Sequence, residues 1–268
     1  KVSGLYGAGQ FNGSSGYEEA AVQGFVAGVN AALKILGRPP LILDRSQGYI
    51  GVLIDDLVTK GTNEPYRMMT SRTEYRLLHR QDNADQRMCP IGYAIGLVSR
   101  ERYERVQEKY EQVKREVHRL EHTGVAATAE LNQLLAAKGE PPAKNSLRLS
   151  DLVRRPRLTY EDLAPLDPDR PALSQAVREQ VEISVKYEGY IRRQLSQVEE
   201  FEKLEQHALP ADADYASIQG LRLEAREKLN AVRPLNLGQA SRISGVSPAD
   251  MGALMIYLEK RDSKNECN

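Results

Sequence analysis

Apolar residues recur at alternating spacings of three and four positions along two long stretches of the chain. The first covers residues 99–122, and its apolar positions are Tyr103, Val106, Tyr110, Val113, Val117 and Leu120. The second covers residues 172–207, and the residues expected on its buried face are Val177, Val181, Ser184, Ile191, Leu195 and Val198. Such spacing places the side chains on one face of an α-helix. The pattern predicts two long amphipathic helices that pack as antiparallel neighbours.

The region before these helices has a different pattern. Apolar and β-branched residues dominate the runs at 41–43 and 49–57, which favours short strands or extended segments around a turn. Further on, Ser71 and Glu74 form a capping-box pattern. This pattern predicts a helix that runs from Ser71 toward His79.

The end of the chain has the pattern of a compact helical unit. Ser247 and Pro248 have the residue types preferred at a helix cap and in a first turn, so a last helix is predicted there. The whole pattern predicts a mainly α fold. Its three regions are expected at 1–64, 65–208 and 209–268.

Composition narrows the class of protein. The 268 residues include 37 basic and 37 acidic side chains, so the net charge does not indicate an anionic partner. No run of about eighteen apolar residues is present, so no membrane span is expected. Cys89 and Cys267 belong to no paired motif, which favours a reduced, cytoplasmic protein. The polar tail at 263–268 is expected to be disordered.

A glycine-rich loop near the start of the chain is the best candidate for a ligand site. Gly9, Gly13 and Gly16 let the backbone approach a ligand closely, and a helix of small residues follows them. The start of a helix presents unpaired N–H groups and a positive partial charge, which suit a phosphate or pyrophosphate. The alternative is a tight turn that serves only to start a closely packed helix.

The amino-acid sequence of this loop and of several later segments resembles the MnmG (GidA) family of flavin-dependent enzymes that modify the wobble uridine of tRNA. The matching segments are AGQFNGSSGYEEAA at 8–21, YIGVLIDD at 49–56, EPYR at 64–67, TSRTEYR at 70–76, DNAD at 82–85, KYEGYI at 186–191 and GQASRISG at 238–245. The resemblance covers nearly the whole chain. It departs from the family at Phe11 and at Ser14 and Ser15, and these changes leave the backbone donors in place.

The resemblance implies a fold and a cofactor site. The first region is expected to be a remnant of an α/β FAD-binding domain, followed by an extended helical region and a small C-terminal helical bundle. Gln10 is expected to contact FAD, with Gly9, Asn12, Gly13 and Gly16 shaping the loop. The family's GxGxxG fingerprint and its catalytic cysteines lie in an N-terminal flavin domain, so this chain is expected to be a C-terminal fragment.

The resemblance also implies an activity and partners. The family is homodimeric and works with the GTPase MnmE, which the C-terminal helical unit is expected to bind. Its co-substrates are NADH and methylene-tetrahydrofolate, and its product carries an aminomethyl or carboxymethylaminomethyl group on C5 of the wobble uridine. The fragment alone is expected to be inactive and to supply binding to tRNA and to MnmE. The alternative is a non-enzymatic helical module that binds RNA or protein.

Arginines in the second region are candidates for tRNA contact. Arg72, Arg76 and Arg80 would share one face of the helix predicted there, and Arg67 flanks them. Arginines hold a phosphate backbone through charge-assisted hydrogen bonds. The alternative is a solvated face or local ion pairs, because acidic residues lie close in sequence. A second, weaker basic group comprises Arg148, Arg154, Arg155 and Arg157.

Two aromatic residues and two acidic residues each have a structural alternative to a ligand role. Tyr66 and Tyr75 lie among the arginines and can stack on a base, although packing is the commoner fate of such tyrosines. Asp55 and Asp56 can bind Mg²⁺ or orient a ligand, but a turn or cap is favoured.

Two further patterns suggest sites that the sequence does not favour. His118 and His122 have the i, i+4 spacing that chelates a metal, but a solvated helix face is favoured and no metal is expected. Residues 240–251 resemble a helix-turn-helix. The second helix carries an acid and almost no base-reading donors, which argues against a DNA-binding regulator.

Overall fold

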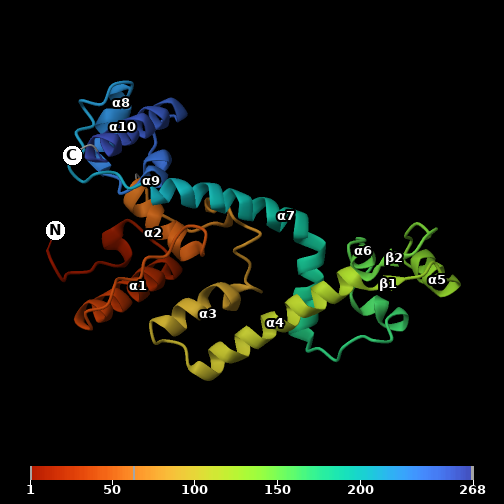
Figure 1. Ribbon diagram of the computed structural model, residues 1–268. Helices are drawn as coiled ribbons and strands as arrows, with labels where there is room; N and C mark the ends of the chain where they lie inside the picture. Colours follow the sequence, from red (N-terminus) through yellow and green to blue (C-terminus); the bar gives the residue numbers. More distant parts are fainter. Residues whose placement is uncertain (1, 63, 267–268) are drawn as a thin grey trace. The chain divides into compact units, whose positions relative to one another are not determined.

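The computed structural model describes residues 2–62 and 64–266, and they form two compact units (Figure 1). The first unit joins residues 1–79 to residues 194–268. The second unit is continuous and comprises Arg80–Arg193. Most of the described chain is helical, and the strands among the described residues form a single two-stranded ribbon. The predicted mainly α fold is confirmed.

The second unit is built on a long helix. The unit contains α3 (Ala84–Ala94), α4 (Arg100–His122), β1 (Gly124–Val125), α5 (Ala129–Ala137), β2 (Leu147–Arg148), α6 (Leu149–Val153), the 3-10 helix η3 (Glu161–Leu166) and the first part of α7 (Gln175–Gln206). Strands β1 and β2 are antiparallel, with Gly124 opposite Arg148. Ser99 caps α4 by accepting a hydrogen bond from the Arg102 N–H.

The apolar seam of α4 lies in the core of this unit, as the spacing predicts. Val106, Tyr110, Val113 and Leu120 are buried there. They pack with side chains that later elements contribute to the same cluster, among them Leu131, Leu135, Leu149, Leu152, Leu158, Val177 and Val181. Burial of this apolar surface is the main stabilising contribution to the second unit.

The first unit begins with two α-helices and two short 3-10 helices and ends with a small bundle. Its first part contains η1 (Gly9–Asn12), α1 (Tyr17–Ile35), α2 (Tyr49–Thr59) and η2 (Thr70–Arg72). Its last part contains α8 (Leu223–Val232), α9 (Leu237–Arg242) and α10 (Pro248–Glu266), the blue bundle in Figure 1. The bundle has its own apolar core, in which Tyr215, Leu229, Leu237 and Leu254 are almost completely buried.

Short strands or extended segments are predicted at 41–43 and 49–57, and this prediction is wrong for 49–57. The first run is irregular, and the second belongs to α2. Val52, Leu53 and Asp56 are buried with the spacing of a helix face, so packing overrides the β-branched composition. Gly51 brings α2 against the preceding backbone, because a Cβ atom there would lie 2.1 Å from the Asp44 carbonyl oxygen.

The prediction of a helix over residues 71–79 is also wrong. Only the short turn η2 forms, and Thr73 is extended. The Glu74 carboxylate does not cap a helix, because Arg45 Nη2 lies 2.9 Å from Glu74 Oε1. Thr73 Oγ1 instead accepts a hydrogen bond from the Tyr75 N–H, at 3.1 Å. These contacts compete with helix formation.

The last helix begins at Pro248, as predicted. It continues through Glu266, whereas the sequence predicts disorder from Ser263. Residues 267–268, including Cys267, lie outside the described residues.

Candidate functional site

The glycine loop is folded around one buried side chain of α1. The exposed fraction of Gln23 is only 2%. Its Oε1 accepts hydrogen bonds from the Gly9 N–H at 2.8 Å and from Asn12 Nδ2 at 3.2 Å. Its Nε2 donates to Ser14 Oγ at 2.9 Å. The single amide group of Gln23 therefore fixes both ends of η1.

Two glycines in this loop have left-handed backbone conformations. The φ angles are 75° at Gly9 and 77° at Gly13, a region that side chains with a Cβ atom rarely adopt. A Cβ atom at Gly13 would also lie 2.5 Å from Thr62 Oγ1. The loop conformation thus depends on glycine at both positions.

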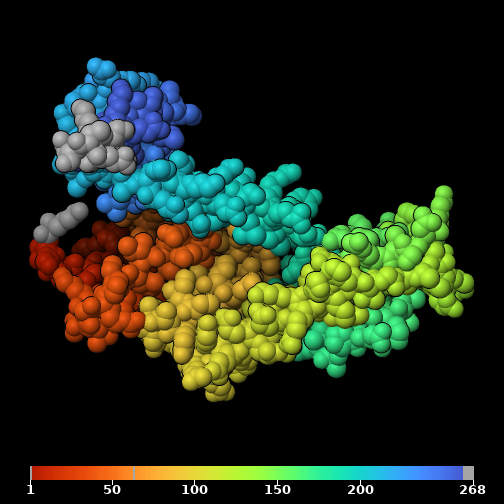
Figure 2. All heavy atoms as spheres, in the orientation of Figure 1, coloured from red at the N-terminus to blue at the C-terminus, as the bar shows by residue number. Residues whose placement is uncertain are grey.

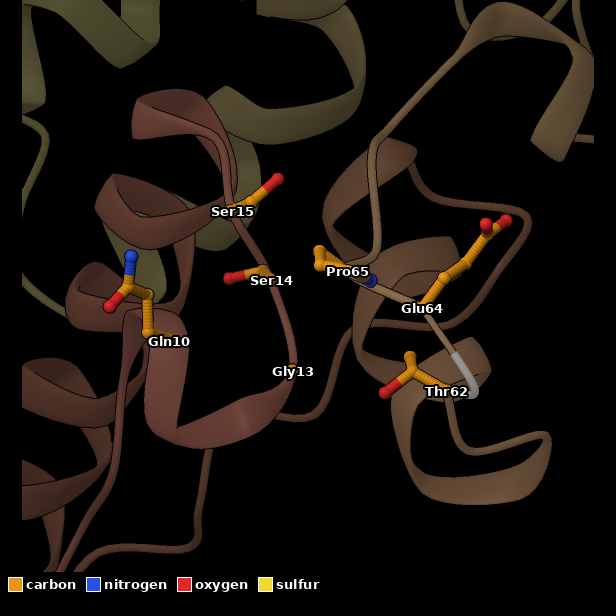
Figure 3. Close-up of a pocket in the computed structure, with 7 residues that line it drawn as sticks. All are labelled: Gln10, Gly13, Ser14, Ser15, Thr62, Glu64 and Pro65. Atoms are coloured by element: carbon orange, nitrogen blue, oxygen red, sulfur yellow. The ribbon is translucent and has the colours of Figure 1, made fainter.

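The loop forms one wall of a pocket of about 330 Å³. Figure 3 shows Gln10, Gly13, Ser14 and Ser15 on one side, and Thr62, Glu64 and Pro65 on the other. The Tyr66 N–H donates to the Gly13 carbonyl oxygen at 2.7 Å, and the Ser15 N–H donates to the Tyr66 carbonyl oxygen at 3.4 Å. These two bonds join the walls next to the pocket.

A carboxylate already lies at the start of α1. Glu19, three residues after the capping position Gly16, accepts a hydrogen bond from the Met68 N–H at 2.6 Å. That bond is the main reason why the pKa of Glu19 is lowered, and Arg67 contributes from 3.5 Å. A Cβ atom at Gly16 would collide with the Glu19 carboxylate. An anionic side chain here competes with the phosphate expected at this helix end.

The loop residues predicted to bind the cofactor divide into two groups. Gly9 and Gly16 are buried, and Asn12 Nδ2 also donates to the Gly7 carbonyl oxygen at 2.8 Å, so these three residues stabilise the loop. Gln10 and Gly13 line the pocket, and the Gln10 side chain is exposed. Gln10 is therefore the member of the set whose side chain is available to a ligand.

Next to Tyr66 is a network of charged side chains, most of them buried, that the sequence did not predict. Arg45 is 2% exposed and contacts Asp56 at 2.7 Å, Asp55 at 3.0 Å and Glu74 at 2.9 Å. Arg242 of α9 contacts Asp55 at 2.6 Å. A buried arginine has no local sequence signature, so its pairing with Asp55 and Asp56 could not be predicted from the sequence.

Tyr66 belongs to this network rather than to an RNA surface. It is buried, and its hydroxyl donates to Asp56 Oδ2 at 2.8 Å. Burial and the neighbouring carboxylate raise the pKa of Tyr66. Burial also raises the pKa of Tyr75, which is 4% exposed. Both tyrosines are packed, which is the alternative that their residue type favours.

The predicted arginine face does not exist, because residues 73–79 are not helical. The guanidinium of Arg72 lies over the Tyr66 ring at 4.8 Å, and Arg67 is exposed beside Glu19. Arg76 is exposed. Arg80 opens the second unit and forms an ion pair with Asp82 at 3.1 Å. Arg67 and Arg72 are thus brought close to the pocket wall through Tyr66.

The weaker basic group has mainly local partners. Arg154 pairs with Asp151 at 2.8 Å, and its other nitrogen pairs with Glu188 at 2.7 Å. Arg155 donates to the Pro141 carbonyl oxygen and Arg157 to the Gly139 carbonyl oxygen. These contacts hold loops of the second unit together.

The segment that resembles a helix-turn-helix has a buried acid near its end, in the first turn of its second helix. Asp250 is fully buried in the first turn of α10 and accepts hydrogen bonds from the Arg222 guanidinium, with Nη2 at 2.8 Å. The Ser247 N–H donates to the same carboxylate at 2.8 Å. The start of α10 is therefore occupied by its own cap.

None of the described helices combines the length and apolarity that a bilayer crossing requires.

Comparison with family models accounts for most of the chain. Residues 100–195 match the tRNA modifying enzyme MnmG/GidA C-terminal helical domain, and residues 197–268 match the MnmG/GidA C-terminal helical bundle. Residues 1–39 match the model of glucose inhibited division protein A. The chain belongs to the MnmG/GidA family.

Individual members of the MnmG/GidA family are closely similar to this chain. The tRNA uridine 5-carboxymethylaminomethyl modification enzyme MnmG of Alkaliphilus oremlandii is 59% identical over 99% of this chain and 42% of its own length. The enzyme of the same name from Caldicellulosiruptor saccharolyticus is 56% identical over 98% of this chain. The form II crystal structure of Aquifex aeolicus GidA covers 96% of this chain with a TM-score of 0.83 and 42% identity. The chain spans about 42% of the length of these curated relatives.

Proposed function

We propose that this chain is the C-terminal part of a flavin-dependent enzyme that modifies the wobble uridine of tRNA. The observation that carries the proposal is the match of the MnmG/GidA helical domain and bundle over residues 100–195 and 197–268. Relatives bearing these regions are named as tRNA uridine 5-carboxymethylaminomethyl modification enzymes.

The pocket beside the glycine loop is the proposed contact site for FAD, and the loop is one wall of it. Gln10 presents an exposed side chain to it, and Gly13 keeps the wall free of a Cβ atom. Gly9, Asn12 and Gly16 support the loop from behind. FAD would supply the redox chemistry, and these residues would bind and orient it. Because Glu19 lies at the start of α1, contact is proposed with an uncharged part of the cofactor rather than with its phosphates.

The proposed tRNA surface is centred on Arg67 and Arg76, the two exposed arginines of the predicted set. Arg72 is held over Tyr66, and Arg80 is paired with Asp82, so their contributions are expected to be smaller. Each phosphate contact would release counterions, which makes binding dependent on salt concentration.

Further properties of the whole enzyme follow from the same assignment. The C-terminal bundle is proposed to bind the GTPase MnmE, and the enzyme is proposed to be a cytoplasmic homodimer that uses NADH and methylene-tetrahydrofolate. Because the chain spans about 42% of its relatives, we expect it to lack modification activity when isolated and to retain tRNA or partner binding.

The assignment can be tested in the full-length enzyme with Arg76→Ala and, as a matched control, Arg105→Ala on the exposed face of α4. Filter binding at several salt concentrations should show weaker tRNA binding and a smaller salt slope only for Arg76→Ala. Nucleoside analysis of the tRNA should show modified wobble uridine with the unsubstituted enzyme. Absence of that product from a flavin-loaded enzyme supplied with its co-substrates and MnmE would refute the proposed function.

A further inference from the structure

The last turn of α4 carries three side chains of the types that bind transition metals. His118, Glu121 and His122 each offer a ligand atom, and these atoms all lie within 4.8 Å of one another. The two imidazole rings are 4.1 Å apart at their centroids. Spacings of three and four residues place all three side chains along one side of the helix. The structure thus adds a carboxylate to the histidine pair that the sequence alone did not favour as a site.

The distances among these groups are close to what a metal requires. Zinc binds histidine nitrogen and carboxylate oxygen at about 2.0–2.2 Å, so its ligand atoms lie roughly 3–4 Å apart. Both histidines are exposed and Glu121 is half-buried, so their side chains have room to rotate. Modest changes in side-chain torsion would therefore close the group around an ion.

The hydrogen bonding of His122 favours a metal ligand. Its Nδ1 lies 2.7 Å from the His118 carbonyl oxygen, which can accept only if Nδ1 carries the proton. Nε2 of the neutral ring then has a free lone pair. Histidines that bind metals commonly donate their other ring N–H to a backbone carbonyl in this manner.

The electrostatic setting also favours a cation. The group lies at the C-terminal end of a 23-residue helix, where the helix dipole places negative partial charge. The cations nearest in sequence are bonded to other acids: Arg119 contacts Glu116 and Asp167, and Arg115 contacts Glu108. Figure 2 shows the yellow-green part of α4 on the visible surface.

We propose that His118, Glu121 and His122 form a surface site for a divalent transition metal of the zinc class. Two imidazoles and one carboxylate are the ligand set that suits Zn²⁺, with water in the remaining positions. The site lies within the second unit and is independent of the flavin pocket and of the proposed tRNA contacts.

Calorimetric titration of ZnCl₂ into the untagged chain tests this site. The Cys267→Ser background removes the thiol of the tail as a competing ligand. We expect one bound equivalent, and His118→Ala or His122→Ala should each weaken binding by about tenfold or more, because each removes a primary ligand. Glu121→Gln should weaken it by a smaller factor. The matched control is His207→Ala, which removes an exposed histidine of the other unit.

Several outcomes would overturn the proposal. These are no binding at millimolar zinc, unchanged affinity in both His118→Ala and His122→Ala, or an equal loss in His207→Ala. Far-UV circular dichroism of each variant checks that α4 is folded. The two histidines are exposed, Glu121 is half-buried, and none of the three belongs to the apolar core, so the variants are expected to keep the helix.

Discussion

The second unit and the first 79 residues of the chain are stabilised in different ways. The second unit buries leucines and valines almost completely, including Leu131, Leu152 and Val181. In the first 79 residues, many of the buried side chains are polar or charged, such as Glu19, Gln23, Arg45 and Asp56. Apolar side chains of that region are exposed instead, with Phe11 at 96% and Tyr17 at 94%.

The difference separates a segment with its own core from a segment organised around polar contacts. Apolar burial drives folding without a partner, whereas exposed apolar side chains near a pocket are typical of surfaces that contact another body or a ligand. The MnmG/GidA relatives are more than twice as long as this chain, which is consistent with further protein covering this region.

Removing Arg45 should have the largest effect. Arg45→Ala removes the buried arginine partner of Asp56, which keeps Lys60 and the Tyr66 hydroxyl, and breaking a buried ion pair costs up to about 3–5 kcal/mol. In the folded protein, burial opposes ionisation of Asp56, but hydrogen bonds from Lys60, Arg45 and Tyr66 outweigh it and lower its pKa. Hydrogen exchange of the α2 amides should show the loss. Unchanged protection of α2 would contradict a structural role for the network.

Truncating the apolar core should have a comparable but slightly smaller effect. Leu152→Ala should cost about 2–5 kcal/mol, because the side chain is fully buried and leaves a cavity. The matched control Leu36→Ala concerns a leucine that is 66% exposed, and it should change the free energy of unfolding by less than about 0.5 kcal/mol. Unfolding in urea, monitored by the hydrogen exchange of each unit separately, measures both free-energy changes. Similar losses in the free energy of unfolding for Leu152→Ala and Leu36→Ala would contradict a difference in apolar burial between the two regions.

Acid should destabilise the C-terminal bundle through Asp250. Hydrogen bonds from Arg222 are the main cause of its lowered pKa in the folded state. Its contribution is therefore present above the ordinary aspartate value of 3.8 and is lost as the pH falls through the folded value. Asp250→Asn should cost about 1–3 kcal/mol at neutral pH and flatten this dependence.

Thermal unfolding of the bundle from neutral pH down to about pH 1 measures the effect, because this range covers nearly the whole interval in which the contribution is lost. The same acid-induced loss in Asp250→Asn would assign the dependence to other carboxylates.

The smallest effect is expected at the exposed aromatic residue of the loop. Phe11→Ser should change the free energy of unfolding of this chain by less than about 0.5 kcal/mol, because Phe11 buries almost nothing here. In the full-length enzyme the same change should be more costly if the remaining protein covers this side chain. Equal thermal shifts in the two contexts would show that Phe11 is solvent-exposed in both.

The sequence predicts the fold well wherever one periodic pattern decides it. The seam from Tyr103 to Leu120 predicts α4 to within a residue of its start, and the Ser247–Pro248 pair predicts the start of α10. The pattern misleads at α2 and at residues 71–79, where tertiary contacts of Asp56 and Glu74 with Arg45 override local preference.

The site was predictable only in part. The glycine loop is evident from the sequence, since glycine spacing is a local signal, whereas Gln10 is expected only from the resemblance to the family. The anchoring by Gln23 and the charges around Arg45 join residues far apart in the chain, and no local pattern encodes such pairings. The prediction of a shared arginine face was wrong for the same reason, because it required a helix that long-range contacts prevent.

The most direct test of the central claim compares two glycines in the full-length enzyme. Gly13 and Gly37 both have positive φ angles, of 77° and 65°, so alanine strains the backbone similarly at each. Only Gly13 lines the pocket, and the space beside Gly37 is open. The flavin absorbance per polypeptide should fall strongly in Gly13→Ala and stay at the unsubstituted level in Gly37→Ala. Full flavin content in Gly13→Ala would contradict the claim that this loop is a wall of the cofactor site.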